Sequence, residues 1–196
     1  MLLTERKQLW ILAGGNGAGK STFYRTQLAP LGLPFVNADI LAKELYPQTP
    51  EEHSYDAAKL ATEIRFKLLH EGRSFCFETV FSHPSKIDFV AQAKALGYEI
   101  ILVFIHLDLI SLNQARVAQR ISEGGHNVPD EKVASRIPRL LQNIKKTLPL
   151  CDQVYILNNS RLDSPFQQVA FIRNSQKIQQ KIHLPEWAKA LLENYL

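Results

Sequence analysis

Residues 7–22 read KQLWILAGGNGAGKST and contain the most specific pattern in the chain. The apolar run at residues 9–13 is typical of a buried parallel strand. Residues 14–21 follow it directly and match G-x-x-x-x-G-K-[ST], the phosphate-binding P-loop. Because the full match lies after an expected strand and before an expected helix, it predicts a nucleotide phosphate site, not merely a structural turn.

Each part of this motif has a physical role in binding phosphate. Glycine permits sharp turns and lets backbone N–H groups approach phosphate oxygens. Lys20 adds a mobile positive charge for the β- and γ-phosphates, and the Ser21 hydroxyl is a ligand for Mg²⁺. A helix that begins here also points its positive dipole end at the phosphates. We therefore expect ATP and Mg²⁺ as cofactors, bound at Gly14, Gly15, Asn16, Gly17, Ala18, Gly19, Lys20, Ser21 and Thr22.

The length and composition describe one globular domain, residues 1–196. A hydrophobic content of 45% and a charged content of 21% are ordinary for such a protein. No apolar run has the length of a membrane span, and the N-terminal residues lead straight into the expected core strand, which argues against a signal peptide. Cys76 and Cys151 lack metal-ligand spacing and fit buried, reduced thiols. We expect a cytoplasmic protein that does not bind a membrane.

The net charge of +4 is compatible with a nucleic-acid partner. However, the basic residues are dispersed along the chain and form no long run, whereas a nucleic-acid-binding face usually gathers them. The sequence therefore favours a solvated surface with a few phosphate-binding arginines over a nucleic-acid partner.

Strands alternate with helices along the chain. After the first strand, apolar runs predict strands at 34–39, 74–80, 98–107 and 153–158, with helices at 21–29, 40–46, 51–72, 84–96, 109–123 and 130–148. Such alternation implies a parallel sheet with helices on both faces. The predicted fold is α/β: a kinase-like P-loop NTPase, built as a three-layer sandwich with a mainly parallel five-stranded core sheet. We also expect a helical lid at about 116–139, and a C-terminal hairpin and helix at about 165–196.

Polar residues end three of the expected strands. Ligands of parallel sheets bind beyond the carboxyl ends of the strands, so the P-loop, Asn37 with Asp39, and Glu78 with Thr79 should meet at one edge. The Asp39 carboxylate can accept a proton from a substrate hydroxyl or hold Mg²⁺ through water, or it can merely cap the next helix. Glu78 and Thr79 either contact the acceptor substrate or Mg²⁺, or cap the sheet.

Arginines gather in the expected lid. Arg116 and Arg120 are four residues apart and share a helix face, and Arg136 lies on the returning helix. Phosphoryl transfer needs such charges because negative charge changes on the transferred group, although surface ion pairs are the alternative. We therefore expect Lys20, Asp39 and Arg120 to be catalytic, Arg116 to bind nucleotide and Arg136 to bind substrate.

Two further polar residues have open roles. His126 follows the hinge-like pair at 124–125 and is either a substrate contact or an exposed loop residue. Asn159 follows the fifth expected strand, where a base edge is often read, and is either a nucleotide contact or a turn residue.

Taken together, these motifs resemble the zeta-toxin-type P-loop kinases, more narrowly the zeta-toxin-like proteins often labelled predicted ABC-type ATPases. The similar stretches are AGGNGAGKST, FVNADILA, FCFETVFS, the arginine helix with RISEGGHNVP and the closing hydrophobic strand, over about residues 8–160. The resemblance implies a kinase with Asp39 as proton acceptor, Glu78 and Thr79 at the acceptor, and Arg120 on the phosphates. It also implies an acceptor of the UDP-N-acetylglucosamine type and an antitoxin protein as a partner.

Three functions remain open from the sequence. The first is a kinase that moves the γ-phosphoryl group of ATP to a hydroxyl of a small molecule, which Asp39 and the arginine lid favour. The second is a nucleotide-dependent switch or binding protein with incidental ATP hydrolysis. The third is a nucleic-acid 5′-hydroxyl kinase, which would need a contiguous basic groove leading to Asp39.

Overall fold

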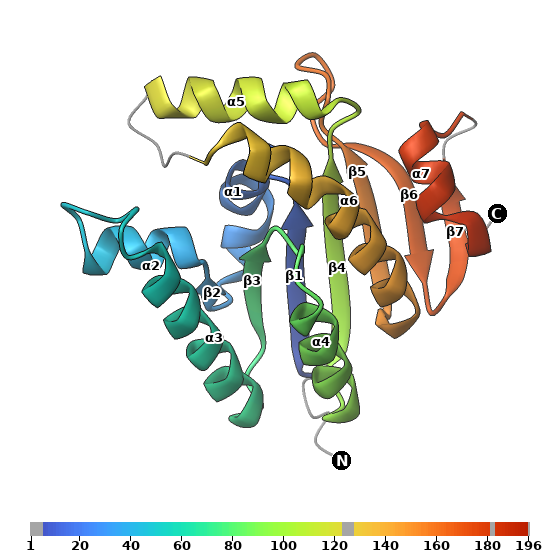
Figure 1. Cartoon of the computed structure of the whole chain (residues 1–196). Helices are drawn as coiled ribbons and strands as arrows, with labels where there is room; N and C mark the ends of the chain where they lie inside the picture. The colour runs from blue at the N-terminus through green and yellow to red at the C-terminus, as the bar shows by residue number, and fades with distance from the viewer. Residues whose placement is uncertain (1–5, 123–127, 181–182, 196) are drawn as a thin grey trace.

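A seven-stranded β-sheet forms the centre of the fold (Figure 1). The computed structural model describes residues 6–122, 128–180 and 183–195. The first five strands are parallel and lie in the order β2-β3-β1-β4-β5, and β6 and β7 extend the sheet as an antiparallel hairpin. The strands are β1 (Gln8–Gly14), β2 (Phe35–Val36), β3 (Phe75–Thr79), β4 (Glu99–His106), β5 (Gln153–Asn158), β6 (Gln167–Arg173) and β7 (Gln176–Gln180).

Helices connect the parallel strands and pack on the sheet. In Figure 1, α4 and α6 lie in front of the sheet, and α5 runs across the carboxyl ends of the strands. The α-helices are α1 (Lys20–Phe23), α2 (Ala38–Leu45), α3 (Ser54–His70), α4 (Ser85–Ala95), α5 (Ile110–Ser122), α6 (Asp130–Thr147) and α7 (Glu186–Leu191).

The central strand β1 is buried on both faces, as its apolar run predicts. Leu9 and Ile11 belong to the larger core cluster, which includes residues of α3, α4 and α6. Leu12, on the opposite face, belongs to a smaller cluster with Leu28, which follows α1. The sheet is therefore covered by helices on both faces, with the larger core on one of them. This is the expected three-layer sandwich.

The predicted fold class is confirmed, and the five-stranded parallel core is present as expected. The hairpin expected near the C-terminus is also present, and β6 pairs with β5, so the sheet has seven strands. The strand expected at 34–39 is shorter, because Asn37 caps α2 and the chain is helical from Ala38.

The helix expected at 21–29 is also different. Its α-helical part ends at Phe23 and continues as a π-helix, Tyr24–Leu28, followed by a 3₁₀ turn, Ala29–Leu31. Pro30 lies in the first turn of that 3₁₀ segment, where its missing N–H costs nothing. The helical run therefore continues through Pro30 to Leu31, although the sequence predicted that Pro30 would end it.

The parallel strands present their carboxyl ends at one edge of the sheet, where the P-loop and α5 lie (Figure 1). This is the edge at which parallel sheets bind ligands. Among the described residues, no helix is long and apolar enough to cross a membrane.

Tyr98 ties the end of α3 to the sheet and offers a test of the fold. Its hydroxyl lies 3.2, 3.0 and 3.0 Å from the carbonyl oxygens of Leu68, Leu69 and Arg73, and the residue is 2% exposed. Tyr98→Phe should lower the free energy of unfolding by about 1–2 kcal/mol, because buried carbonyl groups lose a donor. Denaturant unfolding measures this loss.

The control for this prediction is Tyr55→Phe, because Tyr55 is 81% exposed. That substitution should change stability by less than about 0.5 kcal/mol. Equal stabilities of the Tyr98→Phe variant and the unsubstituted protein would show that the hydroxyl does not hold the end of α3.

Candidate functional site

The P-loop joins β1 to α1 at the carboxyl edge of the sheet. Gly17 and Gly19 have φ angles of 75° and 97°, which side-chain-bearing residues rarely adopt. A Cβ on Gly17 would lie 2.6 Å from the backbone oxygen of Asn113 in α5. Glycine at this position is therefore required both by the turn and by the close packing of α5 against the loop.

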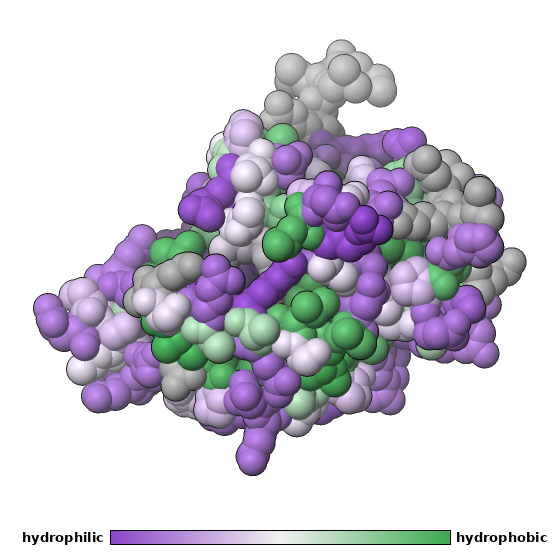
Figure 2. All heavy atoms as spheres, turned by 90° about the horizontal axis from the view of Figure 1, so that it is seen from above, coloured by the Kyte–Doolittle hydropathy of each residue, from purple (hydrophilic) through white to green (hydrophobic). Residues whose placement is uncertain are grey.

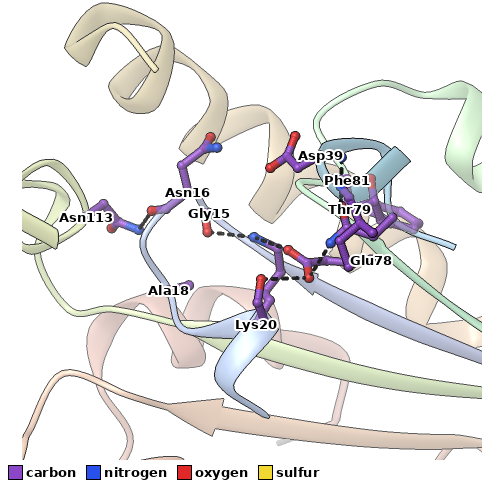
Figure 3. A network of polar contacts seen from close by, with 12 residues as sticks. Gly15, Asn16, Ala18, Lys20, Asp39, Glu78, Thr79, Phe81 and Asn113 are labelled. Atoms are coloured by element: carbon purple, nitrogen blue, oxygen red, sulfur yellow. Dashed lines mark hydrogen bonds and ion pairs between the residues drawn. The ribbon is translucent and has the colours of Figure 1, made fainter. Parts of the chain in front are cut away.

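Two buried asparagines support the loop from different elements. The Nδ2 of Asn113 donates to the carbonyl oxygen of Asn16 over 2.7 Å (Figure 3). The Nδ2 of Asn159, after β5, donates to the carbonyl oxygen of Ala18 over 2.9 Å, and its Oδ1 accepts from the N–H of Phe166. Both amide atoms of Asn159 thus bind the protein's own backbone, so the structure gives it a place in supporting the loop. Its contact with a nucleotide stays a prediction.

Lys20 is folded into the site and is only 7% exposed. Its Nζ donates to the carbonyl oxygen of Gly15 over 3.0 Å and lies 3.7 Å from Oε1 of Glu78 (Figure 3). Burial lowers the pKa of Lys20, and the carboxylates of Glu78 and Asp39 act in the opposite direction. The ammonium group of Lys20 is thus held beside the P-loop by a backbone oxygen and a carboxylate.

Glu78, from the end of β3, joins the P-loop to the start of α2. Its Oε2 accepts hydrogen bonds from Ser21 Oγ over 3.1 Å and from Asn37 Nδ2 over 2.9 Å. With Lys20 on its other oxygen, this carboxylate contacts three side chains of two segments. We predicted Glu78 as a contact of the acceptor or of Mg²⁺. The structure places its carboxylate in a cavity wall beside Lys20 and the Ser21 hydroxyl, and both contacts stay predictions.

The capping alternative for Asp39 is wrong. Asn37 is the N-cap of α2, because its Oδ1 accepts from the backbone N–H groups of Asp39 and Ile40 at 2.8 and 3.2 Å. Asp39 lies in the first turn of the helix with an exposed side chain, and no hydrogen bond or ion pair of its carboxylate is present among the described residues. Its carboxylate is therefore available for another purpose.

A cavity of about 780 Å³ brings together seven of the predicted site residues. Figure 2 views this end of the molecule, where hydrophilic and apolar side chains are interspersed. The wall of this cavity includes seven predicted residues from five segments of the chain: Asn16, Lys20, Asp39, Glu78, Thr79, Arg120 and Arg136. A P-loop lysine, two carboxylates and two guanidinium groups thus line one volume large enough for small ligands.

Two residues of the cavity wall also contact the protein itself, and the other predicted residues lie outside the wall. Arg136 also donates from Nη1 to Oδ1 of Asn16 over 3.3 Å, and Thr79 Oγ1 accepts from the N–H of Phe81. Arg116 is not part of the cavity wall; its Cβ lies beside Gly17. Ser21 and Thr22 are exposed in α1. His126 and residues 124–125 lie outside the described residues.

Sequence reasoning missed several residues of this region. Asn113 was overlooked because an asparagine in a helix carries no motif of its own. Asn37 was expected at this edge of the sheet, but its hydrogen bond to Glu78 and its role as the cap of α2 were not predicted. Arg65 had a detectable signal: it lies four residues after Ala61 on the apolar face of α3, where a charged residue is unusual. Lys86, on the second residue of α4, had none.

The comparisons with known proteins agree with this geometry. A profile described as an AAA domain matches residues 9–143. The match spans more than half of the chain, so the protein belongs to this family of P-loop domains. An uncharacterized protein of Haemophilus influenzae is 28% identical over 138 residues, which are 67% of this chain and 98% of the relative.

Two solved structures with a similar fold come from a protein complex and from a toxin–antitoxin system. A chain of the AvrRxo1-ORF1:-ORF2 complex with ATP has a TM-score of 0.72 and 18% identity. This comparison covers 97% of our chain but only 64% of the other. The chromosomal toxin–antitoxin system PezAT of Streptococcus pneumoniae matches with a TM-score of 0.62 and 16% identity, covering 98% of our chain and 78% of the other. At these identities the likeness establishes the fold.

The contact between Asn37 and Glu78 can be tested by pH. Asn37→Asp keeps a good helix cap but removes the 2.9 Å hydrogen bond to Glu78. It places a second carboxylate next to that of Glu78. Their repulsion raises the folded-state pKa of one of them, so the variant should lose about 1–3 kcal/mol at pH 8 and less as pH falls towards 4. Thermal unfolding at several pH values measures the difference.

Asn37→Ser is the matched control, since it caps the helix without adding a carboxylate. Its loss of stability should be nearly independent of pH. If Asn37→Asp behaves in the same way, Asn37 and Glu78 do not interact as the structure indicates.

Proposed function

We propose that the protein is a P-loop phosphotransferase that moves the γ-phosphoryl group of ATP to a hydroxyl group of a small molecule. The observation that carries this proposal is the carboxylate of Asp39, unengaged among the described residues, in the same cavity as the P-loop lysine. A nucleotide site alone needs Lys20 and the loop, but a carboxylate beside it also provides a proton acceptor.

Binding of ATP begins at the P-loop. The loop N–H groups and the amino end of α1 would hold the phosphates, and Lys20 would exchange its 3.0 Å bond with Gly15 for a phosphate oxygen. Arg136, which already bonds Asn16, would add charge at the same loop. The AAA domain match supports ATP as the nucleotide, as does the structural neighbour that was solved with ATP.

The residues around Ser21 fit a Mg²⁺ ion by their chemistry. Its hydroxyl lies 3.1 Å from the Glu78 carboxylate, and Asp39 lines the adjoining cavity, so the donors are the hard oxygens that Mg²⁺ prefers. We assign Ser21 as a direct ligand and Asp39 as a contact through water. Bound there, the ion would neutralise charge on the phosphates.

Transfer then needs the acceptor hydroxyl between Asp39 and the γ-phosphate. The hydroxyl oxygen forms a bond to γ-phosphorus as the bond between that phosphorus and the β–γ bridging oxygen breaks. The hydroxyl proton passes to Asp39, and ADP leaves. Arg120, on the same cavity wall, would stabilise charge on the group in transfer.

The size of the cavity favours a kinase over a switch protein. A nucleotide-dependent switch needs no space beside Asp39, whereas the cavity of about 780 Å³ continues from Lys20 to side chains of α3 and α4. Among hydroxyl acceptors, the zeta-toxin resemblance favours a sugar nucleotide of the UDP-N-acetylglucosamine type. An antitoxin-like protein partner belongs to the same proposal and is supported by the toxin–antitoxin system among the structural neighbours.

The direct test incubates the protein with ATP, Mg²⁺ and a panel of sugar nucleotides, nucleosides and metabolites. Mass spectrometry should find an acceptor that gains the mass of one phosphate, together with ADP. The same panel with Lys20→Ala protein is the blank. ADP formation without any phosphorylated acceptor would favour the switch hypothesis.

Asp39→Asn should separate transfer from nucleotide binding. The amide keeps the shape but cannot take up the proton, so transfer should fall by about 10²-fold or more while ATP affinity changes little. The cap of α2 is Asn37, so the fold should be unaffected. Steady-state transfer and ATP titration measure the two effects.

The matched control is Asp88→Asn, because Asp88 is an exposed carboxylate in the first turn of another helix, α4. It should leave both quantities unchanged. Transfer by Asp39→Asn at the original rate would exclude Asp39 as the proton acceptor and make Glu78 the next candidate.

Arg120→Ala should reduce kcat more than it weakens ATP binding. Charge on the transferred group changes most in the transition state, so a loss of about 10²-fold in kcat is expected. Arg139→Ala, on an exposed side chain of α6, is the control. A raised KM for ATP with unchanged kcat would instead identify Arg120 as a ground-state contact.

A further inference from the structure

Two further cations line the cavity, and they lie on helices outside the P-loop motif. Arg65 comes from α3 and Lys86 from α4, and both share the cavity with Asp39. Neither has a part in the nucleotide site proposed above. Their positive charges are close enough to interact, since the charge of Arg65 lowers the pKa of Lys86.

Arg65 is buried to an unusual degree for an arginine, with 5% of its surface exposed. Its Nη2 donates to Thr62 Oγ1 over 2.7 Å, but its buried Nε has no hydrogen-bond partner among the described residues. The guanidinium lies over the rings of Phe77 and Phe89, at 5.1 and 5.7 Å from their centres. The aromatic rings hold the group in one orientation and leave part of its hydrogen-bonding capacity unused.

The charges of Arg65 and Lys86 are not compensated by a carboxylate in the part of the chain that the structure describes. Within residues 6–122, 128–180 and 183–195, neither Arg65 nor Lys86 forms an ion pair, and Lys86 forms no hydrogen bond through its side chain. The Glu78 carboxylate in the same cavity is already engaged by Ser21, Asn37 and Lys20. Burying unpaired cations is costly, so this arrangement needs a compensating gain.

The pKa values of Arg65 and Lys86 reflect the same cost of burying a positive charge. Burial lowers the pKa of Arg65 to about 10, and burial together with Arg65 lowers the pKa of Lys86 to about 8. Stacking on two aromatic rings accounts for part of the stability of Arg65. It does not account for a second cation placed beside the first at the cavity wall.

We propose that Arg65 and Lys86 bind an anionic group of the acceptor, so that the acceptor is a hydroxyl compound that also carries a phosphate or a carboxylate. This inference rests on the proposed phosphotransfer. A guanidinium matches the two oxygens of either anion, and the adjacent ammonium adds a third donor. Binding the anion on α3 and α4 would position the acceptor relative to Asp39, which lies in the same cavity.

The subsite can be tested by binding alone, without any transfer. The full chain is first saturated with Mg²⁺ and a non-hydrolysable ATP analogue, so that the P-loop is occupied. Inorganic phosphate and acetate are then titrated separately by calorimetry. We expect one further anion site in the unsubstituted protein, and the stronger of the two anions identifies the preferred group.

Lys86→Gln should weaken this anion binding by about tenfold, the usual effect of losing a charge-assisted contact. Lys67→Gln is the matched control, because Lys67 is on α3 with a side chain that is 77% exposed. Arg65→Gln should have a larger effect, but its buried position puts folding at risk, so the conclusion depends on Lys86. No second anion site, or equal affinities of the unsubstituted and Lys86→Gln proteins, would overturn the proposal.

Failure of the subsite is distinguishable from failure of the proposed function. If the ATP analogue does not bind, the phosphotransferase proposal fails. The phosphate titration is then repeated on Lys20→Ala protein with and without Lys86→Gln, which still tests the subsite. Conversely, a neutral acceptor phosphorylated equally well by the unsubstituted and Lys86→Gln proteins would overturn the subsite and leave the kinase proposal intact.

Discussion

The contact between Glu78 and Lys20 is the interaction on which the site depends. The Glu78 carboxylate near the end of β3 and the Lys20 ammonium at the start of α1, with side chains only 10% and 7% exposed, lie 3.7 Å apart. Each charge would be costly in this position without the other. Glu78 then uses its second oxygen for Ser21 and Asn37, so one side chain fixes the distance between the P-loop and α2. The position of Asp39, two residues after Asn37, follows from this contact.

The sheet makes these contacts possible because parallel strands end at the same edge. β1 lies between β3 and β4, so the P-loop has Glu78 on one side and the start of α5 on the other. The Nδ2 of Asn113 in α5 bonds the loop backbone, and the Nδ2 of Asn159 bonds it from the end of β5. The loop is therefore supported on several sides before any ligand binds, which reduces the cost of ordering it around phosphate.

Local patterns in the sequence were sufficient for the fold and the P-loop, because a buried strand and a glycine-rich turn are both determined by neighbouring residues. The sequence also predicted that Asn37 and Glu78 lie at the same edge of the sheet. It did not predict the hydrogen bond between them, which joins side chains 41 positions apart. The cap of α2 was likewise not decided by local sequence, so Asp39 was considered as the cap where the structure has Asn37. Asn37 and Asp39 are both good capping residues, and only the path of the chain from β2 decides between them. Arg65 was missed although a charged residue on the apolar face of α3 is unusual. Its meaning depends on the assembled cavity, where it forms no ion pair among the described residues.

The charges of the whole cavity form a consistent electrostatic pattern. Six lysine and arginine side chains line it against three carboxylates: Lys20, Arg65, Lys86, Arg120, Lys132 and Arg136 against Asp39, Glu51 and Glu78. ATP with Mg²⁺ would satisfy the cations nearest the P-loop and would still leave those of α3 and α4. Two anionic ligands in one cavity repel each other, and separate groups of cations offset that repulsion at each end. A cavity that bound only ATP would have no need of the second group, and this excess of positive charge is the physical argument for an acceptor that is itself an anion.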